Sequence, residues 1–162
     1  MKKTVALFFI VPLSVFVSCD ELNTVQVIFD SKTFHEQRAL WQASNVINYQ
    51  YDLNASGFIG YSGTIFVENG TFKKDEPQTD WDDINDFLDY STIDKAYAAI
   101  EDRFLAYHNT QQSSRDVYYT EIIVEYDTAI HIPTKIIYKY HSPPNVAVDG
   151  TFHFEIKAFA SL

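Results

Sequence analysis

The densest group of side chains that could do chemistry is a run of acidic residues between Asp75 and Asp89. Carboxylate oxygens are the ligands that Ca²⁺ prefers, and this ion takes about 6–8 of them. The spacing after Asp80 lacks both the glycine and the final acidic residue of an EF-hand loop. If the segment is a helix, its carboxylates point outward and do not converge, and the first of them complements the helix dipole. We therefore interpret the run as a solvated helix face without a metal ion; the alternative is a calcium site at Asp80, Asp82, Asp83 and Asp86.

Other motifs that would indicate catalysis are incomplete. His35-Glu36 is followed by Gln37-Arg38, so the zinc-binding pattern H-E-x-x-H is not formed. The segment 60–63, Gly-Tyr-Ser-Gly, matches neither the G-x-S-x-G pattern of a nucleophile elbow nor a phosphate loop. No nucleophile can be paired with a base. The sequence thus predicts no catalytic residue, no cofactor and no enzyme.

Tyrosine is unusually frequent, with 11 among 162 residues. A tyrosine offers an apolar ring and a polar hydroxyl, so tyrosine-rich faces can bind sugars, peptides or small aromatic ligands. Most of the tyrosines here alternate onto strand faces that we expect to be buried, which favours packing in the core. The alternative is a binding face made by Tyr49, Tyr51, Tyr138 and Tyr140.

The N-terminus has the features of a secretory signal peptide. Lys2 and Lys3 form a basic start, and an apolar stretch at 4–17 follows that is short for a membrane-spanning helix, which needs about 20 residues. The stretch ends in Phe16-Val17-Ser18-Cys19, which resembles the lipobox of bacterial lipoproteins. In such proteins the cysteine becomes the lipidated N-terminus of the mature chain. We predict a signal peptide at 1–18, a lipidated Cys19 with a tether at 19–30, and one domain at 31–162.

Anchoring by acyl chains would hold the exported protein in a bacterial membrane, either the inner or the outer one. Cys19 is the only cysteine, so an internal disulfide is excluded and the core must stabilise the domain alone. The formal net charge is −10 at pH 7, which disfavours nucleic acid as a partner because of its own negative charge. The membrane, through the lipid, and a protein of the cell envelope are the expected partners of a monomeric protein.

Periodicity then predicts the elements. A helix is expected over Ser31–Ile47 with Ser31 as N-cap, and a second one from Ile93 to Tyr107 after a capping-box spacing. A short helix at 80–89 is a third candidate. Asn69-Gly70 lies between two extended runs and predicts a hairpin with a type I′ turn. Alternation and turn residues predict strands at 48–55, 64–68, 71–74, 117–126, 134–141 and 151–159. The glycine-rich segment 57–63 is expected to be a loop or a bulged hairpin connection.

These elements predict an α+β fold, in which one antiparallel sheet of about five or six strands has two or three helices packed on one face. In the last strand, we expect Phe152, Phe154, Ile156 and Ala158 on one face and Phe159 on the other.

The order of these motifs resembles a family of bacterial lipoproteins that carry a small domain of unknown function. The residues concerned are Trp41, Ile47-x-Tyr49-x-Tyr51, Ile65-x-Val67-x-Asn69-Gly70, Thr92-Ile93-Asp94, Val124-x-Tyr126-Asp127 and Ile132-Pro133-Thr134-Lys135-Ile136. That family often has a glycine between the Tyr-Asp pair and the proline, where this chain reads Thr-Ala-Ile-His-Ile. The resemblance implies an exported or membrane-anchored domain and carries no catalytic residues over.

The leading functional prediction is a lipid-anchored domain that binds a protein or peptide partner in the cell envelope. A carrier of a small apolar or aromatic ligand in a tyrosine-lined pocket is the alternative, and an enzyme of unidentified type comes third.

Overall fold

The computed structural model describes residues 27–57, 60–73, 87–109, 118–141 and 150–162. Its elements are α1 (Ser31–Ser44), β1 (Tyr49–Ser56), β2 (Tyr61–Glu68), β3 (Thr71–Lys73), the 3₁₀ turn η1 (Leu88–Tyr90), α3 (Ile93–Asn109), β4 (Tyr118–Asp127), β5 (Ile132–His141) and β6 (Thr151–Ser161). Most of the predicted helix at 80–89 lies outside the described residues, and its end forms η1.

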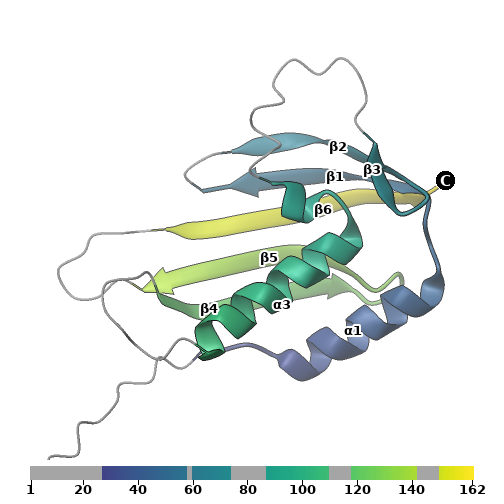
Figure 1. Cartoon of the computed structure of the whole chain (residues 1–162). Helices are drawn as coiled ribbons and strands as arrows, with labels where there is room; N and C mark the ends of the chain where they lie inside the picture. Colours follow the sequence, from purple (N-terminus) through teal and green to yellow (C-terminus); the bar gives the residue numbers. More distant parts are fainter. Residues whose placement is uncertain (1–26, 58–59, 74–86, 110–117, 142–149) are drawn as a thin grey trace, which may run out of the picture.

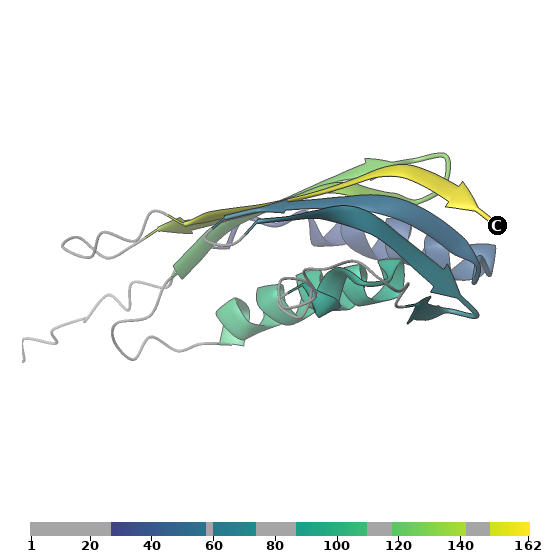
Figure 2. The ribbon, with the colours of Figure 1, turned by 90° about the horizontal axis from the view of Figure 1, so that it is seen from above.

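The strands form one six-stranded sheet in the order β3-β2-β1-β6-β5-β4, with every neighbouring pair antiparallel (Figure 1). Both α-helices lie on the same side of this sheet (Figure 2). The predicted antiparallel sheet is thereby confirmed, and its composition of sheet and helices fits the α+β class. Neither described helix is long and apolar enough to cross a membrane.

The core lies between the sheet and the helices. Tyr49 pairs with Val67 and Tyr51 with Ile65 across β1 and β2, and all four side chains are buried on the helix side. Each fully buried large apolar side chain stabilises the fold by about 1.5–3 kcal/mol relative to exposure. The helices contribute the opposite layer, which consists of Phe34 and Trp41 from α1 and Ile93, Ala96, Tyr97 and Ile100 from α3.

The opposite face of the sheet carries charged side chains in pairs. Lys157 bonds to Glu155 at 2.5 Å, and this bond is the main reason why the pKa of Glu155 lies below its usual value. The cross-strand pairs Lys135–Glu125 and Lys139–Glu121 have distances of 3.1 and 2.6 Å. These side chains are in contact with solvent, and solvent-exposed ion pairs contribute about 0–1 kcal/mol each to the free energy of unfolding. The ion pairs of this face therefore add little to stability.

The ends of α1 differ from the prediction. Its N-cap is Asp30, whose carboxylate accepts a hydrogen bond from the Thr33 N–H at 3.1 Å, and Ser31 is already helical. The helix stops at Ser44 because Asn45 adopts a left-handed conformation with φ 52°, a common helix ending. Ile47, predicted as part of the buried helix face, is therefore outside the helix and 51% exposed.

Two turns use residues with positive φ. Asn69 and Gly70 have φ of 52° and 71°, which confirms the type I′ turn. Between β4 and β5, His131 has φ 60°, in the segment where the resembling family often has glycine. Tyr97 donates its hydroxyl to the His131 carbonyl at 2.8 Å, and His131 Nδ1 lies 3.0 Å from Gln37 Oε1. These contacts to both helices hold a conformation that histidine adopts only at a cost.

The predicted loop at 57–63 is wrong in its second half, because β2 begins at Tyr61. Ser62 pairs with Asn54 of β1 and donates its hydroxyl to the Asn54 side chain at 2.6 Å. At Gly63 a Cβ atom would lie 2.6 Å from the Tyr61 hydroxyl oxygen. This glycine thus makes room for a neighbouring ring and does not form a turn.

A bulge in β6 reverses the predicted face of its last residues. Ala158 has φ 50° and lies within a register shift against β1, so it is exposed and Phe159 turns to the helix side. The Phe159 ring stacks on Tyr49 at 5.4 Å and meets Trp41 edge-on at 5.9 Å. The prediction that put Ala158 on the buried face and Phe159 opposite is wrong, because one extra residue shifts the alternation.

We expect Ala158→Gly to raise the free energy of unfolding by up to about 1 kcal/mol, because glycine adopts a positive φ without the strain that alanine suffers there. The matched control Ala160→Gly lies in the same strand without a positive φ and should lower it by about 0.5–1 kcal/mol. Urea denaturation of both variants measures the two signs, and destabilisation of equal size by both would contradict the bulge.

Candidate functional site

The tyrosines predicted as a binding face lie in the interior. Tyr49, Tyr51 and Tyr138 are at most 1% exposed, and the Tyr140 side chain lies outside the described part. Tyr51 donates its hydroxyl to the Tyr90 carbonyl at 2.5 Å, and Tyr90 donates its own to the Tyr138 hydroxyl at 3.0 Å. Their rings and hydroxyls are used by the core, so they present no surface to a ligand in this conformation.

The Tyr49 hydroxyl has a structural task at the start of α3. It accepts a hydrogen bond from the Ile93 N–H at 3.1 Å, while the Thr92 hydroxyl accepts one from the Lys95 N–H. The first N–H groups of a helix have no partner inside the helix, so these two oxygens satisfy donors that would otherwise be buried unpaired. Burial raises the pKa of Tyr49 to about 12 and that of Tyr51 well above its usual value.

The remaining predicted sites stay predictions. Cys19 and the four aspartates of the alternative calcium site, Asp80, Asp82, Asp83 and Asp86, all lie outside the described residues. Within the described ranges, no group of three or more histidine, cysteine or acidic side chains is placed to hold a metal ion.

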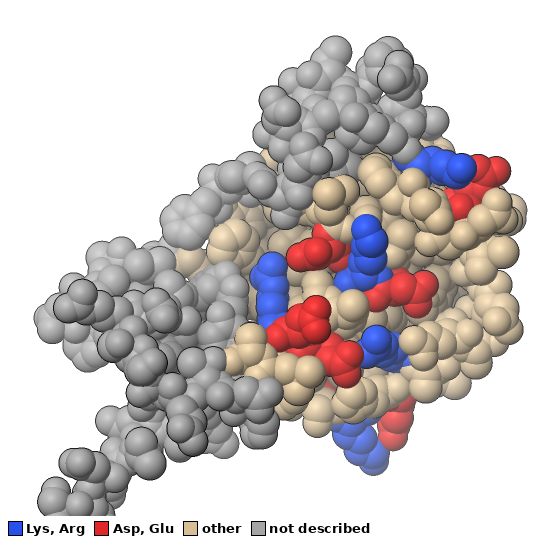
Figure 3. All heavy atoms as spheres, in the orientation of Figure 1, with Lys and Arg blue, Asp and Glu red and all other residues tan. Residues whose placement is uncertain are grey.

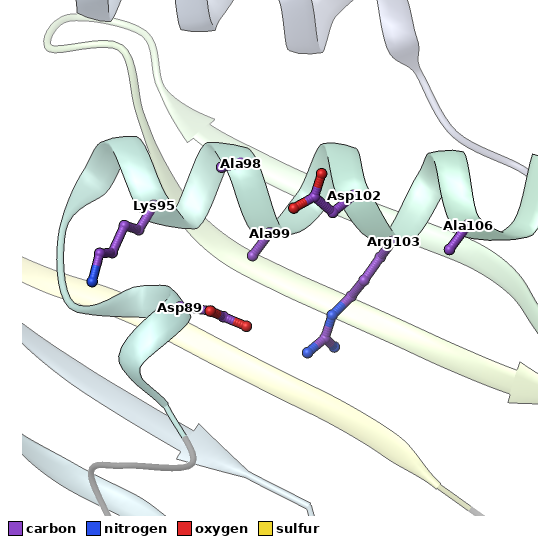
Figure 4. Close-up of a pocket in the computed structure, with 7 residues that line it drawn as sticks. All are labelled: Asp89, Lys95, Ala98, Ala99, Asp102, Arg103 and Ala106. Carbon is purple, nitrogen blue, oxygen red and sulfur yellow. The ribbon is translucent and has the colours of Figure 1, made fainter.

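A groove of about 390 Å³ runs along the outer side of α3, next to η1. Asp89, Lys95 and Arg103 point into it (Figure 4), and Asp102 with three alanines of α3 completes the lining that the structure describes. Lys95 bonds to the Ser91 hydroxyl at 3.2 Å, and the Arg103 guanidinium lies 4.5 Å from the centre of the Tyr138 ring.

The groove has the volume of a small-molecule site, about 300 Å³ or more, but not the chemistry of one. Its two cations and two carboxylates balance, and both cations are engaged with neighbouring groups. Over the whole helix-bearing face, positive and negative side chains of the described residues alternate (Figure 3). Tyr49, Tyr51 and Tyr138 are not among the described residues that line this groove.

A more specific feature lies at β4, the last strand of the sheet. Ile28, in the segment predicted as tether, forms a parallel bridge with Glu121, and its carbonyl accepts a hydrogen bond from the Ile122 N–H at 3.0 Å. The adjacent Phe29 ring packs on Phe34 of α1 and Phe104 of α3, with ring centres 5.3 and 4.9 Å apart. The end of the predicted tether is thus built into both the sheet edge and the core.

Beyond Ile28 the edge of β4 is open. Backbone groups in a strand point alternately to its two sides, so Val124, two residues after Ile122, also directs its N–H and C=O away from β5. No other described strand pairs with β4 on that side. The strand ends at Asp127, so the open stretch beyond Ile122 is short.

An apolar groove of about 210 Å³ lies along this open stretch, between β4 and the start of α1. Its floor and walls are mostly apolar, and its charged lining is acidic: Asp30 and Glu121. The Thr33 N–H is the main reason why the pKa of Asp30 is low, so this carboxylate is ionised at neutral pH. The full described lining is Ile28, Phe29, Asp30, Thr33, Glu121, Ile122, Ile123, Val124 and Tyr126.

Sequence reasoning missed this site. Alternation predicts the strand that ends at Tyr126, whereas Ile28 and Phe29 belong to the predicted tether, and both segments line the groove. Their meeting depends on β4 being the outermost strand, which is a property of the topology and not of local periodicity. The one local signal is an apolar run directly before a helix cap, where a tether would be expected to be polar.

We expect alkaline pH to destabilise the protein through its buried tyrosines. A tyrosine in the unfolded chain has a pKa of about 10, so between pH 10 and 12 the folded protein retains the Tyr49 proton that the unfolded chain has lost. This contribution to the free energy of unfolding is full below pH 10 and is lost as the pH rises through 12. Urea denaturation across this range measures it.

The Tyr49→Phe variant should be less stable at neutral pH by about 1 kcal/mol, because the Ile93 N–H loses its acceptor, and should lose less stability between pH 10 and 12. A pH dependence identical to that of the wild type would show that the Tyr49 hydroxyl is not buried.

Comparison of the chain with protein-family models, with curated proteins and with solved structures gives no match. The resemblance to a lipoprotein family therefore stays a prediction.

Proposed function

We propose that the protein is a lipid-anchored domain of the bacterial cell envelope that binds a protein or peptide partner and has no enzymatic activity of its own. The observation that carries this proposal is the edge of β4, where backbone groups without a partner among the described strands lie beside an apolar groove with acidic residues in its lining. Strand edges of this kind bind extended segments of other proteins, because backbone hydrogen bonds supply affinity and adjacent pockets select side chains.

The position of the edge relative to the predicted anchor supports an envelope role. Cys19 and Val27 are eight positions apart in the sequence, so they can lie at most about 29 Å from each other even when the chain is fully extended. Because Val27 and Phe29 pack on the core and Ile28 pairs with β4, the lipid would hold this edge near the membrane surface. The domain would bind its partner near the membrane surface, and its short tether would restrict its orientation there.

The small-ligand alternative has less support. The predicted tyrosines are packed and hydrogen-bonded, and the groove beside α3 has a balanced set of engaged charges. It therefore stays a prediction, as does the third possibility of an enzyme.

We expect Cys19→Ser to abolish incorporation of a labelled fatty acid and to release the protein from the membrane fraction, because the substitution removes the sulfur atom that would carry the acyl chain. Labelling and fractionation of cells expressing either form measure this. Label retained by the variant would show that Cys19 is not the anchor.

Partner binding can be tested in cells with a photo-reactive phenylalanine analogue at a single position of the full chain. Ile28 and Leu40 are both exposed large apolar residues, 61% and 47%, but only Ile28 lies at the β4 edge. We expect light-dependent adducts with an envelope protein from position 28 and not from position 40. The analogue is also placed at Ile137, which is partly exposed on the face of the sheet opposite the helices. A lack of adducts from both position 28 and position 137 would contradict the proposed function.

A further inference from the structure

We propose that the β4 edge beside Ile28 binds an extended peptide with alternating apolar and basic side chains. This inference rests on the proposed function and specifies the chemistry of the partner. Three independent properties of the edge support it: the direction of its backbone groups, the shape and polarity of the adjacent groove, and the sign of the surrounding charge.

The backbone of β4 offers hydrogen bonds to a new strand. The Ile122 N–H is already bonded to the Ile28 carbonyl, which shows that an extended segment fits against this edge. The chain then leaves β4 to begin α1 at Ser31, and the outward N–H and C=O of Val124 follow beyond that point. A peptide strand placed there would continue the pairing that Ile28 begins, with successive side chains turned alternately to the helix side and to the opposite face of the sheet.

The groove selects the side chains that point inward. Val124, Tyr126 and Phe29 supply apolar surface next to the free backbone groups, and the volume of about 210 Å³ suits an apolar side chain. Because strand side chains alternate between the two faces of the sheet, a peptide that places apolar residues on the helix side directs the intervening residues to the opposite face, where Glu121 and Glu125 of β4 lie.

The charge beside the groove favours basic residues. Asp30 and Glu121 line the groove, and its described lining includes no lysine or arginine. Glu121 is paired with Lys139, which leaves Asp30 as the carboxylate available to a ligand cation. Lys32, whose charge contributes to the low pKa of Asp30, has an 85% exposed side chain that lies 3.9 Å from Glu36 along α1.

A second copy of the chain is a less favourable occupant. Each copy has a formal net charge of −10, so two acidic β4 edges would repel one another. A basic peptide would instead be attracted over a distance of about 10 Å at 0.1 M salt, and more weakly at higher salt.

The test uses the full chain in detergent and measures fluorescence anisotropy with defined peptides. The probe is an acetylated and amidated peptide of alternating lysine and valine; its controls are the matching glutamate–valine peptide and the lysine–valine peptide with alternate backbone nitrogens methylated. We expect the unmodified lysine–valine peptide to bind at least about tenfold more tightly than either control, since the controls lose charge attraction or backbone bonds.

Two variants link binding to this edge. Val124→Pro removes an outward N–H without breaking the ladder to β5 and should weaken binding about tenfold. Asp30→Asn keeps a good N-cap for α1 but removes the charge, so it should weaken lysine–valine binding about threefold without changing the urea midpoint. If Val124→Pro fails to fold, Asp30→Asn and the methylated peptide still decide the question.

Equal binding of the lysine and glutamate peptides, unchanged binding to Val124→Pro, or no binding of the lysine–valine peptide would overturn the inference. A dimer in sedimentation that Val124→Pro dissociates would also overturn it, in favour of a second copy at the edge. If in-cell adducts form from position 28 while the lysine–valine peptide does not bind, the proposed function stands and the inference about peptide chemistry fails.

Discussion

The structure depends on a layer of tyrosine hydroxyls that are buried between the sheet and the helices and must therefore be hydrogen-bonded. An unpaired buried hydroxyl costs about 1–3 kcal/mol, so each phenol oxygen restricts where the helical layer can lie. The Tyr49 hydroxyl accepts a hydrogen bond from the Ile93 N–H in the first turn of α3. The Tyr51 hydroxyl donates one to the Tyr90 carbonyl, just before that turn. One turn further along α3, Tyr97 donates its hydroxyl to the His131 carbonyl in the turn between β4 and β5. The abundance of tyrosine thus has a structural cause, because apolar rings of similar size would not position α3.

The position of α3 determines where α1 and the tether lie. Trp41 of α1 donates its indole N–H to Asp94 at 3.2 Å, and Arg38 pairs with Glu101 of α3 at 2.6 Å. The start of α1 is then close to β4, where the core receives Phe29 and the edge receives Ile28. The tyrosine layer positions α3, α3 positions α1, and the start of α1 brings Ile28 to the edge of β4. The geometry of the candidate site therefore depends on all of these contacts.

Much of the fold could be predicted from local pattern. The buried faces of β1 and β5, the type I′ turn at Asn69-Gly70 and the α3 helix all follow from alternation, turn chemistry and capping. Prediction failed where one backbone conformation outweighed the pattern. Ala158 adopts a positive φ, and the side chains after it point to the opposite faces of the sheet from those predicted. Gly63 lies within a strand, where a Cβ atom would clash with the Tyr61 hydroxyl. The candidate site was unpredictable for a different reason, since it requires the sheet order that makes β4 an edge.

The most direct test of an open β4 edge is hydrogen–deuterium exchange of single backbone amides in the full chain, followed by nuclear magnetic resonance. We expect slow exchange for Ile122, whose N–H is bonded to the Ile28 carbonyl, and for Ile123, whose N–H faces β5. Fast exchange is expected for Val124, whose N–H points away from β5 and has no partner among the described strands. A Val124 amide protected as strongly as those of Ile122 and Ile123 would show that the β4 edge is already occupied, and would contradict an open edge as the binding site.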